Sequence, residues 1–395
     1  MVRTVGRRQF LTAAANACLS GALVSCAAGM RETPRGNAAL PTLSLEPLHA
    51  STDRITNITV CRRPFRPQGP RLDVEPLMGK TVVHNYGHGG SGWSLSWGSS
   101  AIAVEKALMT GDRQVGVVGC GAMGLTSALL LQQAGAQVTI YTKELPPATP
   151  SFRATGLWAP DSRICFEPYA TAEFKEVWEG MARQSFATYQ NYLGLPGRPV
   201  EFIDFYLVTD AWNRPPRPAP TDESLPKFAG LQEALIGDLN PLTQQFAPGQ
   251  HPLGPHYLQA HSRMMFNLPS YIRTLMSDFR DAGGRIQIEE FHTPADLVRV
   301  RERTLINATG YGSRSLFHDQ SLVPIRGQLA RAIPQMRIDY GLQYRDALFA
   351  PRRDGFVFQV IGLNDYYGFN DDTTEPDRSE AEHAVQTIAE LFSVG

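Results

Sequence analysis

The chain has few of the features that mark several protein classes. Five cysteines occur in 395 residues, without metal-ligand spacing or obvious disulfide pairing, which argues against a zinc site or a disulfide scaffold. The formal net charge is −1, so no basic excess is present to attract nucleic acid. The longest apolar run, residues 12–26, is too short to span a bilayer. What remains is a globular composition, 43% hydrophobic, on a chain without internal repeats and long enough for two domains.

The N-terminal segment has the pattern of an export signal. GRRQFL (6–11) carries a twin arginine before the apolar run, which is typical of a Tat signal, and LVSC (23–26) resembles a bacterial lipobox. Lipidation would leave Cys26 as the mature N-terminus, with residues 27–45 as a tether to the folded body. We expect a periplasmic or membrane-anchored lipoprotein of a bacterium. A Sec-type signal, or a chance arginine pair, is the alternative.

A dinucleotide-binding turn is the clearest internal motif. QVGVVGCGAMGLTSALLLQQAGAQVTIYTKE (114–144) has the order strand, glycine turn, helix, strand. Gly119 suits a tight turn, Gly121 the approach of a pyrophosphate, and Gly124 close packing of helix on strand. The helix N-terminus around Met123 offers unpaired N–H groups to phosphate. The alternative is a glycine turn that occurs by chance.

Two later segments indicate FAD rather than NAD. The second strand ends at Glu144, whose carboxylate suits ribose hydroxyls. RTLINATGYGSRSL (303–316) contains Asn307-Ala308-Thr309-Gly310, similar to the ATG motif of FAD-dependent oxidoreductases. AGGRIQIEEF (282–291), which ends at Phe291, is similar to the strand that contacts adenine in those proteins. The alternative for both is an ordinary strand pair in the same sheet.

Four stretches carry a resemblance to one family. They are HNYGHGGSGWSLSWG (84–98), RPFRPQGPRL (63–72), ATGLWAP (154–160), and NATG with PIRGQ (324–328). On these motifs the chain resembles the D-amino-acid oxidases, in the glutathione-reductase-like FAD superfamily, over most of residues 46–395. The resemblance implies an α/β fold: a Rossmann-like FAD-binding domain with an interleaved α+β substrate domain on a mixed or antiparallel sheet.

The order of these motifs differs from the family's order. RPFRP and HNYGHGG close the family's sequences, whereas here they precede the nucleotide turn. We interpret this as a circular permutation that moves residues 46–110 to the front, joined through a predicted amphipathic helix over 100–114 that Gly111 stops. The alternative, fusion with a second truncated copy, is disfavoured because no second glycine-rich run occurs.

This interpretation predicts discontinuous domains. The signal would occupy residues 1–26 and the tether 27–45. The FAD-binding domain would combine 70–160 with 270–328. The substrate-binding domain would combine 46–69, 161–269 and 329–395.

The resemblance also implies roles for individual residues. Arg63 matches the arginine that binds the substrate carboxylate, and Tyr344 a tyrosine that assists it, although Tyr340 is nearby and the three arginines around residue 63 could be solvated loop charges. Gly90 would accept a hydrogen bond from the amine through its carbonyl. A second family tyrosine falls on Leu348. The residues expected around FAD are Gly119, Gly121, Met123, Gly124, Lys143, Glu144, Ser151, Gly156, Leu157, Phe291, Gly89, Gly92 and Ser94.

The expected activity is oxidative deamination of D-amino acids, by hydride transfer from Cα to flavin N5 with no protein base. The products would be 2-oxo acid, ammonia and, with molecular oxygen, hydrogen peroxide. His84 and His88 are expected to fix their loop by hydrogen bonds. Neutral or apolar side chains are favoured, because an acidic one would need a second cation, for which Arg62 and Arg345 are near in sequence. The alternatives are a dehydrogenase that passes electrons to a quinone and a non-catalytic flavin-binding lipoprotein.

Overall fold

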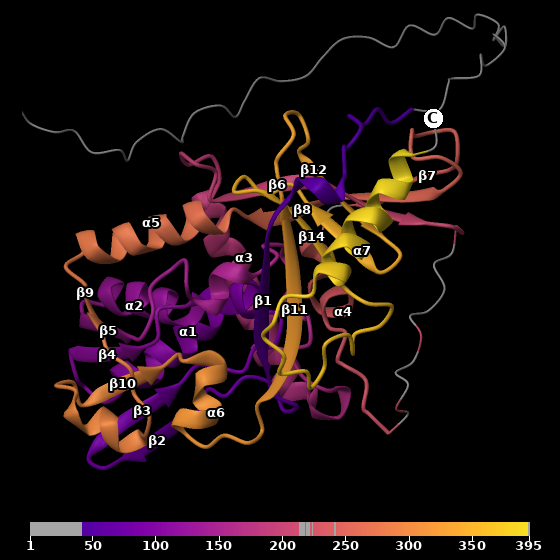
Figure 1. Ribbon diagram of the computed structural model, residues 1–395. Helices are drawn as coiled ribbons and strands as arrows, with labels where there is room; N and C mark the ends of the chain where they lie inside the picture. The colour runs from indigo at the N-terminus through magenta and orange to yellow at the C-terminus, as the bar shows by residue number, and fades with distance from the viewer. Residues whose placement is uncertain (1–41, 213–217, 219–221, 223, 241, 394–395) are drawn as a thin grey trace, which may run out of the picture. The chain divides into compact units, whose positions relative to one another are not determined.

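The structure, a computed structural model, describes residues 42–393 apart from 213–217, 219–221, 223 and 241. The export signal, Cys26 and most of the tether lie outside the described residues. Within them, every helix is too short or too polar to cross a membrane. Two sheets organise this part of the chain, and the helices pack on them (Figure 1).

The first sheet has six strands and is parallel except at one edge. In spatial order it contains β2 (Val74–Leu77), β3 (Lys80–His84), β10 (Thr304–Asn307), β4 (Gln114–Val118), β5 (Gln137–Thr142) and β9 (Arg285–Ile288). Strands such as VGVV are apolar on both sides because both faces of a parallel sheet are covered. Helices α1 (Gly92–Leu108) and α2 (Ala122–Gln133) cover one face, and α5 (Leu268–Asp281) packs on α2. This sheet is the predicted Rossmann-like domain.

Helix α1 begins earlier than the sequence predicted. The expected helix covered residues 100–114, but α1 starts at Gly92 and ends at Leu108, with Gly111 in the left-handed region at φ 82°. The tryptophan-rich half of the glycine run is therefore helical. Both tryptophans in it are buried, because α1 lies between the sheet and α3 (Ala172–Tyr189).

The second sheet has eight strands and is mixed, as predicted for the substrate domain. In spatial order it contains β1 (Ile55–Phe65), β11 (Val323–Ala332), β14 (Phe356–Val360), β13 (Ala347–Ala350), β12 (Tyr340–Tyr344), β6 (Val200–Thr209), β8 (Tyr257–Phe266) and β7 (Gln244–Phe246). One face packs under α7 (Arg378–Ala389), while the other carries a smaller apolar cluster. The short helices are α4 (Gln232–Ile236) and α6 (Ser313–Leu316).

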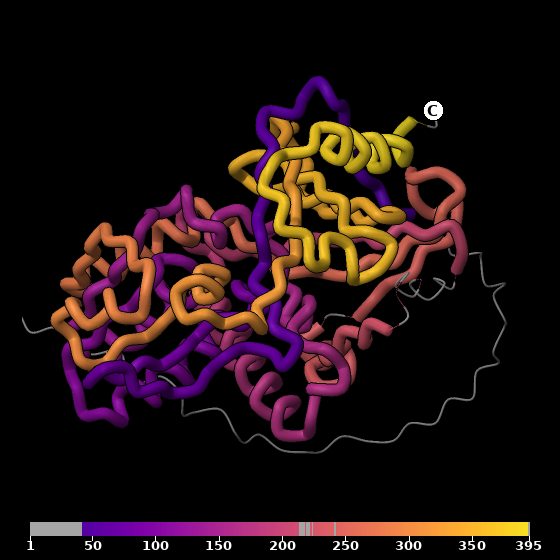
Figure 2. The backbone as a smooth tube through the Cα atoms, turned by 60° about the horizontal axis from the view of Figure 1, so that its bottom comes forward, coloured from indigo at the N-terminus to yellow at the C-terminus, as the bar shows by residue number. Residues whose placement is uncertain are grey.

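The predicted domain boundary at residue 328 needs a correction. Residues 324–328 were assigned to the FAD-binding domain, but β11 runs without a break from Val323 to Ala332 in the eight-stranded sheet. It pairs antiparallel with β1 along most of its length, and the two strands run side by side in Figure 2. β11 lies between β1 and β14 and belongs as a whole to the eight-stranded sheet. The boundary between the two domains therefore falls before Val323.

One expectation from the predicted domains is confirmed. The strand that leads to His84 lies in the same sheet as Val115–Val118, with one strand between them. The described C-terminal end also meets the start of the described body: Arg378 Nη2 donates to the Thr52 carbonyl at 3.1 Å, and Leu391 shares a buried cluster with Leu48. Gly395 itself lies outside the described residues.

Candidate active site

Three loops meet where β3, β10 and β4 end. Asn307, the last residue of β10, is in register with the last residue of β3 on one side and of β4 on the other. The loops that follow these strands, 85–91, 308–312 and 119–121, therefore lie at one edge of the sheet. This edge is where α/β sheets bind their ligands. A glycine run that precedes the nucleotide turn in sequence is thus its neighbour in space.

The glycines of the nucleotide turn are required by close contacts. A Cβ on Gly119, which has φ 109°, would lie 2.5 Å from the Ala308 carbonyl oxygen. A Cβ on Gly124 would lie 2.0 Å from the Gly119 carbonyl oxygen, so helix α2 can pack at this distance only without a side chain there. A Cβ on Gly121 would meet the hydroxyl of Ser151 at 2.8 Å. The glycines of the turn therefore place no side chain of their own over the first turn of α2, which suits phosphate binding.

Glycines are required in the 84–98 run mainly because other protein atoms lie close to them. A Cβ on Gly89 would lie 1.9 Å from the Arg163 carbonyl oxygen, and one on Gly90 would lie 2.5 Å from the Ser162 hydroxyl. The Gly89 N–H donates to the Pro64 carbonyl at 2.8 Å, and the Gly90 N–H to the Ser162 carbonyl at 2.9 Å. The run therefore docks the end of β1 onto the loop at 162–163.

Both histidines of the run hold the loop, as predicted. His88 is buried, and its Nε2 lies 2.7 Å from the Ser99 hydroxyl. Burial lowers the pKa of His88 to about 3, so the ring is neutral near pH 7. His84 lies 2.9 Å from a Glu75 carboxylate oxygen, and burial is the largest of the influences that lower its pKa.

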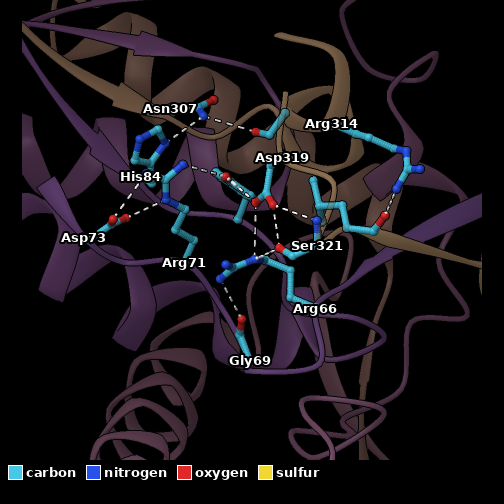
Figure 3. A network of polar contacts seen from close by, with 12 residues as sticks. Arg66, Gly69, Arg71, Asp73, His84, Asn307, Arg314, Asp319 and Ser321 are labelled. Atoms are coloured by element: carbon cyan, nitrogen blue, oxygen red, sulfur yellow. Dashed lines mark hydrogen bonds and ion pairs between the residues drawn. The ribbon is translucent and has the colours of Figure 1, made fainter. Parts of the chain in front are cut away.

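A polar network behind the run joins it to the segment after α6 (Figure 3). The Tyr86 hydroxyl donates to Asp319 at 2.8 Å, and Arg66 Nε lies 3.3 Å from the same carboxylate. On the other side, Asn307 Nδ2 lies 3.1 Å from His84 Nδ1. Side chains that satisfy one another in this way keep loops rigid.

One large cavity begins at this edge and reaches the eight-stranded sheet. Its volume of about 1380 Å³ exceeds the roughly 300–1,000 Å³ of a pocket for a single drug-sized ligand. The predicted site residues that line it are Arg63, Gly89, Gly90, Gly92, Ser94, Gly119, Gly121, Met123, Lys143, Glu144, Ser151, Gly156, Leu157 and Phe291. Gly124 does not line it, because it packs behind the turn.

The part of the cavity next to the six-stranded sheet fits a dinucleotide. The start of α2 lines it, and Glu144 lies just beyond β5. The Ser151 hydroxyl accepts a hydrogen bond from the Ala122 N–H at 3.1 Å, which ties the 149–157 loop to the start of the helix. Lys143 forms an ion pair with Glu290 at 3.6 Å. No cluster of three or more His, Cys, Asp or Glu side chains suited to a metal occurs among the described residues.

Arg63 lies on the sheet side of the cavity. It is in register with Ile325 on β11, and its guanidinium occupies the space above Gly327, where a Cβ would lie 2.4 Å from Nη2. Among the described residues, Arg63 has no hydrogen-bond or ion-pair partner. A cation with free donors in a cavity wall is suited to a carboxylate ligand.

The assignment of Tyr344 is wrong. A two-residue turn joins β12 to β13, with Arg345 at φ 49°, and Tyr344 pairs with Ala347. Tyr344 therefore points to the opposite face, into the cluster under α7, with its hydroxyl 3.4 Å from Asp210. Gln343 and Leu348, the next pair in register, line the cavity instead.

The two arginines considered as second cations already have acidic partners. Arg62 forms an ion pair with Asp372 at 2.6 Å, and Arg345 with Glu390 at 2.6 Å on the far side of the sheet. Arg326 in PIRGQ is structural, because it is buried and paired with Glu380 at 2.6 Å.

The sequence interpretation missed several polar residues of the cavity wall, among them Gln343 and Arg263. The amide Nε2 of Gln343 is buried and has no partner among the described residues. Arg263 lies on β8, two residues before Met265 on the same face. The alternation of a strand was the available signal, but which face borders the cavity depends on the sheet order, which no local pattern contains.

Comparisons with known proteins find several similar chains. The chain is similar to a D-amino-acid oxidase of Streptomyces coelicolor, 30% identical over 225 residues, which cover 55% of this chain and 58% of that protein. The chain thus spans little more than half the length of that relative. A shorter stretch of 52 residues is 48% identical to a D-aspartate oxidase of Talaromyces thermophilus and covers 13% and 14% of the two chains. An iminodiacetate oxidase structure from Chelativorans sp. BNC1 aligns with a TM-score of 0.48 and 12% identity over 71% of this chain and 80% of that one.

The family assignment rests on a longer match. Residues 114–394 match the sequence model of the DAO family, described as FAD dependent oxidoreductase. The matched region begins at β4, so the glycine run and Arg63 stand outside it. The matched region contains the nucleotide turn and the Ala308 loop that packs against Gly119 before the start of α2. The chain belongs to the DAO family of FAD-dependent oxidoreductases, and FAD is its cofactor.

Proposed function

We propose that this protein is an oxidase of D-amino acids that uses FAD. The observation that carries the proposal is Arg63, an unpaired cation in the wall of a cavity that begins at the dinucleotide turn. The bound flavin would accept the hydride from the substrate Cα. The chain's own task is then to hold an amino acid in one orientation beside it.

Three groups in the cavity suit that task. Arg63 would bind the α-carboxylate bidentately. Because Gly327 has no side chain, its position leaves room for the Arg63 guanidinium. The buried amide of Gln343 would donate to the same carboxylate, in the role expected of Tyr344, and so satisfy its orphaned nitrogen. The Gly90 carbonyl would accept from the substrate amine. His88 is unsuited to act as a base, since its ring is neutral and engaged with Ser99.

Oxygen as the electron acceptor, export by the Tat pathway and anchoring through Cys26 are parts of the same proposal. They rest on the resemblance to the oxidases and on the N-terminal motifs. A membrane tether would equally suit a dehydrogenase that reduces a quinone, so the acceptor has to be measured directly.

Mixing the FAD-loaded protein with single amino acids in the absence of oxygen tests the activity. D-Alanine, D-methionine and D-aspartate should be compared with their L-enantiomers. At least one D-form is expected to bleach the flavin while its L-form leaves it yellow. Bleaching by none of them would leave only the flavin-binding lipoprotein, and bleaching by L-forms alone would overturn the stereochemistry.

The acceptor is then identified by admitting air to the reduced protein. One hydrogen peroxide per flavin reoxidised is expected of an oxidase. Slow reoxidation by oxygen together with fast reoxidation by a soluble quinone would instead identify a dehydrogenase.

A further inference from the structure

Arg263 is another cation of the cavity wall, and within the described part of the chain no carboxylate lies at ion-pair distance from it. Its Nε and Nη2 donate to the Trp158 carbonyl oxygen at 3.2 and 3.1 Å, and its guanidinium lies 4.9 Å from the centre of the Phe205 ring. No carboxylate of the described residues forms an ion pair with it. The contacts leave Nη1 and one Nη2 hydrogen free of protein acceptors.

The surroundings of Arg263 are mostly apolar, apart from His261 on the same strand and Asp161. Met265 follows two residues later on the same strand, and Leu157 pairs with it in an isolated bridge. Both belong, with Leu348 and Phe205, to one apolar cluster on this face of the sheet. Burial lowers the pKa of Arg263 to about 10, so the group remains a cation near pH 7. Protein surrounds the side chain, and its exposed part is on the cavity. A charge held in this way is costly unless a ligand neutralises it.

The nearest acidic group is already engaged. Asp161 also lines the cavity and favours the charged form of Arg263 from beyond ion-pair distance. One of its carboxylate oxygens accepts the backbone N–H groups of Leu231 and Gln232, both at 3.0 Å, at the start of α4. Moving that carboxylate to Arg263 would leave both N–H groups unpaired.

We propose that Arg263 binds a second carboxylate of the substrate, so that the preferred substrates are dicarboxylic D-amino acids such as D-aspartate and D-glutamate. This rests on the proposed function, in which Arg63 holds the α-carboxylate. Arg63 and Arg263 would then hold the two carboxylates of such a substrate. Two further arginines of the cavity wall that lack acidic partners among the described residues, Arg153 and Arg314, donate to backbone carbonyls. The preference for neutral side chains expected from the sequence assumed that Arg63 was the only such cation.

Neutral substrates are disfavoured for the same reason. When D-alanine fills the cavity, Arg263 loses hydrating water and gains no partner. The second carboxylate of D-aspartate would take the place of that water. Removing one partner of a buried charge pair costs enough to weaken binding about 30-fold or more. The selectivity should therefore lie in KM and not in kcat.

Two unreactive acids separate this subsite from the catalytic proposal. Succinate and butyrate differ by one carboxylate, and binding of either can be followed by the change it causes in the flavin absorbance. The FAD-loaded wild-type protein should bind succinate about 30-fold more tightly than butyrate. The preference for succinate does not depend on the oxidation of any amino acid. Either proposal can therefore fail while the other stands.

The variants are Arg263→Met, Arg263→Lys and, as a control, Arg345→Met. Arg263→Met should lose the preference for succinate over butyrate, and for D-aspartate over D-alanine. Arg263→Lys should keep part of this preference. Arg345→Met should behave as wild type, because Arg345 is paired with Glu390 outside the cavity. Equal binding of the two acids by the wild-type protein would overturn the proposal. So would an equal loss for both acids in Arg263→Met, which would make Arg263 a support for the Trp158 segment.

Discussion

Arg63 and Gly327 act as a pair across two strands. The guanidinium lies over a residue without a side chain, and a methyl group there would have to displace the flexible end of Arg63 and little else. The position of a single cation in the cavity therefore depends on a glycine of a different strand.

Gly327→Ala should lower kcat/KM for the preferred amino acid by about tenfold to a hundredfold, since misplacement by about 1 Å costs this much. FAD binding and the free energy of unfolding should change little. The matched control is Gly180→Ala on the exposed side of α3, where a Cβ meets nothing within 4 Å. Unchanged kinetics in Gly327→Ala would mean that Arg63 does not act from this position.

His88 ties stability to pH. Its pKa is about 3 in the folded protein and 6.5 in the unfolded chain, so below pH 6.5 the unfolded chain binds the additional proton. The stabilisation is complete above pH 6.5 and is lost as pH falls toward 3, by about 1.4 kcal/mol per pH unit.

Denaturant unfolding at pH 7 and pH 5 measures this effect. Wild type should lose about 2 kcal/mol more than His88→Gln over this interval. The same substitution at His49, which is exposed, should behave as wild type. A parallel loss in wild type and His88→Gln would show that folding does not lower the pKa of His88.

The elements that could be predicted from sequence are those with local signals. VGVVGCGAMG predicted β4, its turn and α2, because the strand, the glycines and the helix are adjacent in the chain. The start of α1 was missed: Gly92 and the serines after it suggested a loop, and burial between the sheet and α3 overrode that propensity. Tyr344 was assigned to the wrong face of β12, because the face on which a hairpin residue lies depends on the length of the turn that follows it. Arg263 was missed because its neighbours on the cavity wall come from distant segments.

The nucleotide turn predicts a graded effect of adding a methyl group. Gly124→Ala sets a Cβ 2.0 Å from a backbone oxygen, which can move only by separating α2 from β4, whereas Gly121→Ala meets a hydroxyl that can rotate. Gly124→Ala should lose bound FAD and unfold at a lower denaturant concentration. Gly121→Ala should keep its fold and weaken FAD binding alone. Equal stability of the two variants, by denaturant unfolding, would contradict this account of the turn.

At the scale of the whole molecule, the order of the segments is a proposal of its own. We propose that the chain is a circular permutation of the family's arrangement. The placement of β3 two strands from β4, and the meeting of α7 with the first described residues, support this.

A chain that starts at residue 112, runs to 393 and continues through a short linker into residues 46–110 should restore the original order. It should fold, bind FAD and oxidise the same amino acids, because the contacts are unchanged and only the loop connections differ. It should be compared with residues 46–393 in their natural order by FAD content and by thermal unfolding. A rejoined chain that is soluble but fails to bind FAD would argue against the permutation.

The central claim is that an amino acid is held by Arg63 beside FAD in this cavity. The most direct measurement is the rate at which the preferred D-amino acid reduces the flavin in Arg63→Ala, in single turnovers without oxygen. The variant should keep its FAD, and its second-order rate constant for reduction should fall about a hundredfold or more, because a buried partner of the carboxylate is lost. Reduction at the wild-type rate by a variant that retains FAD would contradict the account.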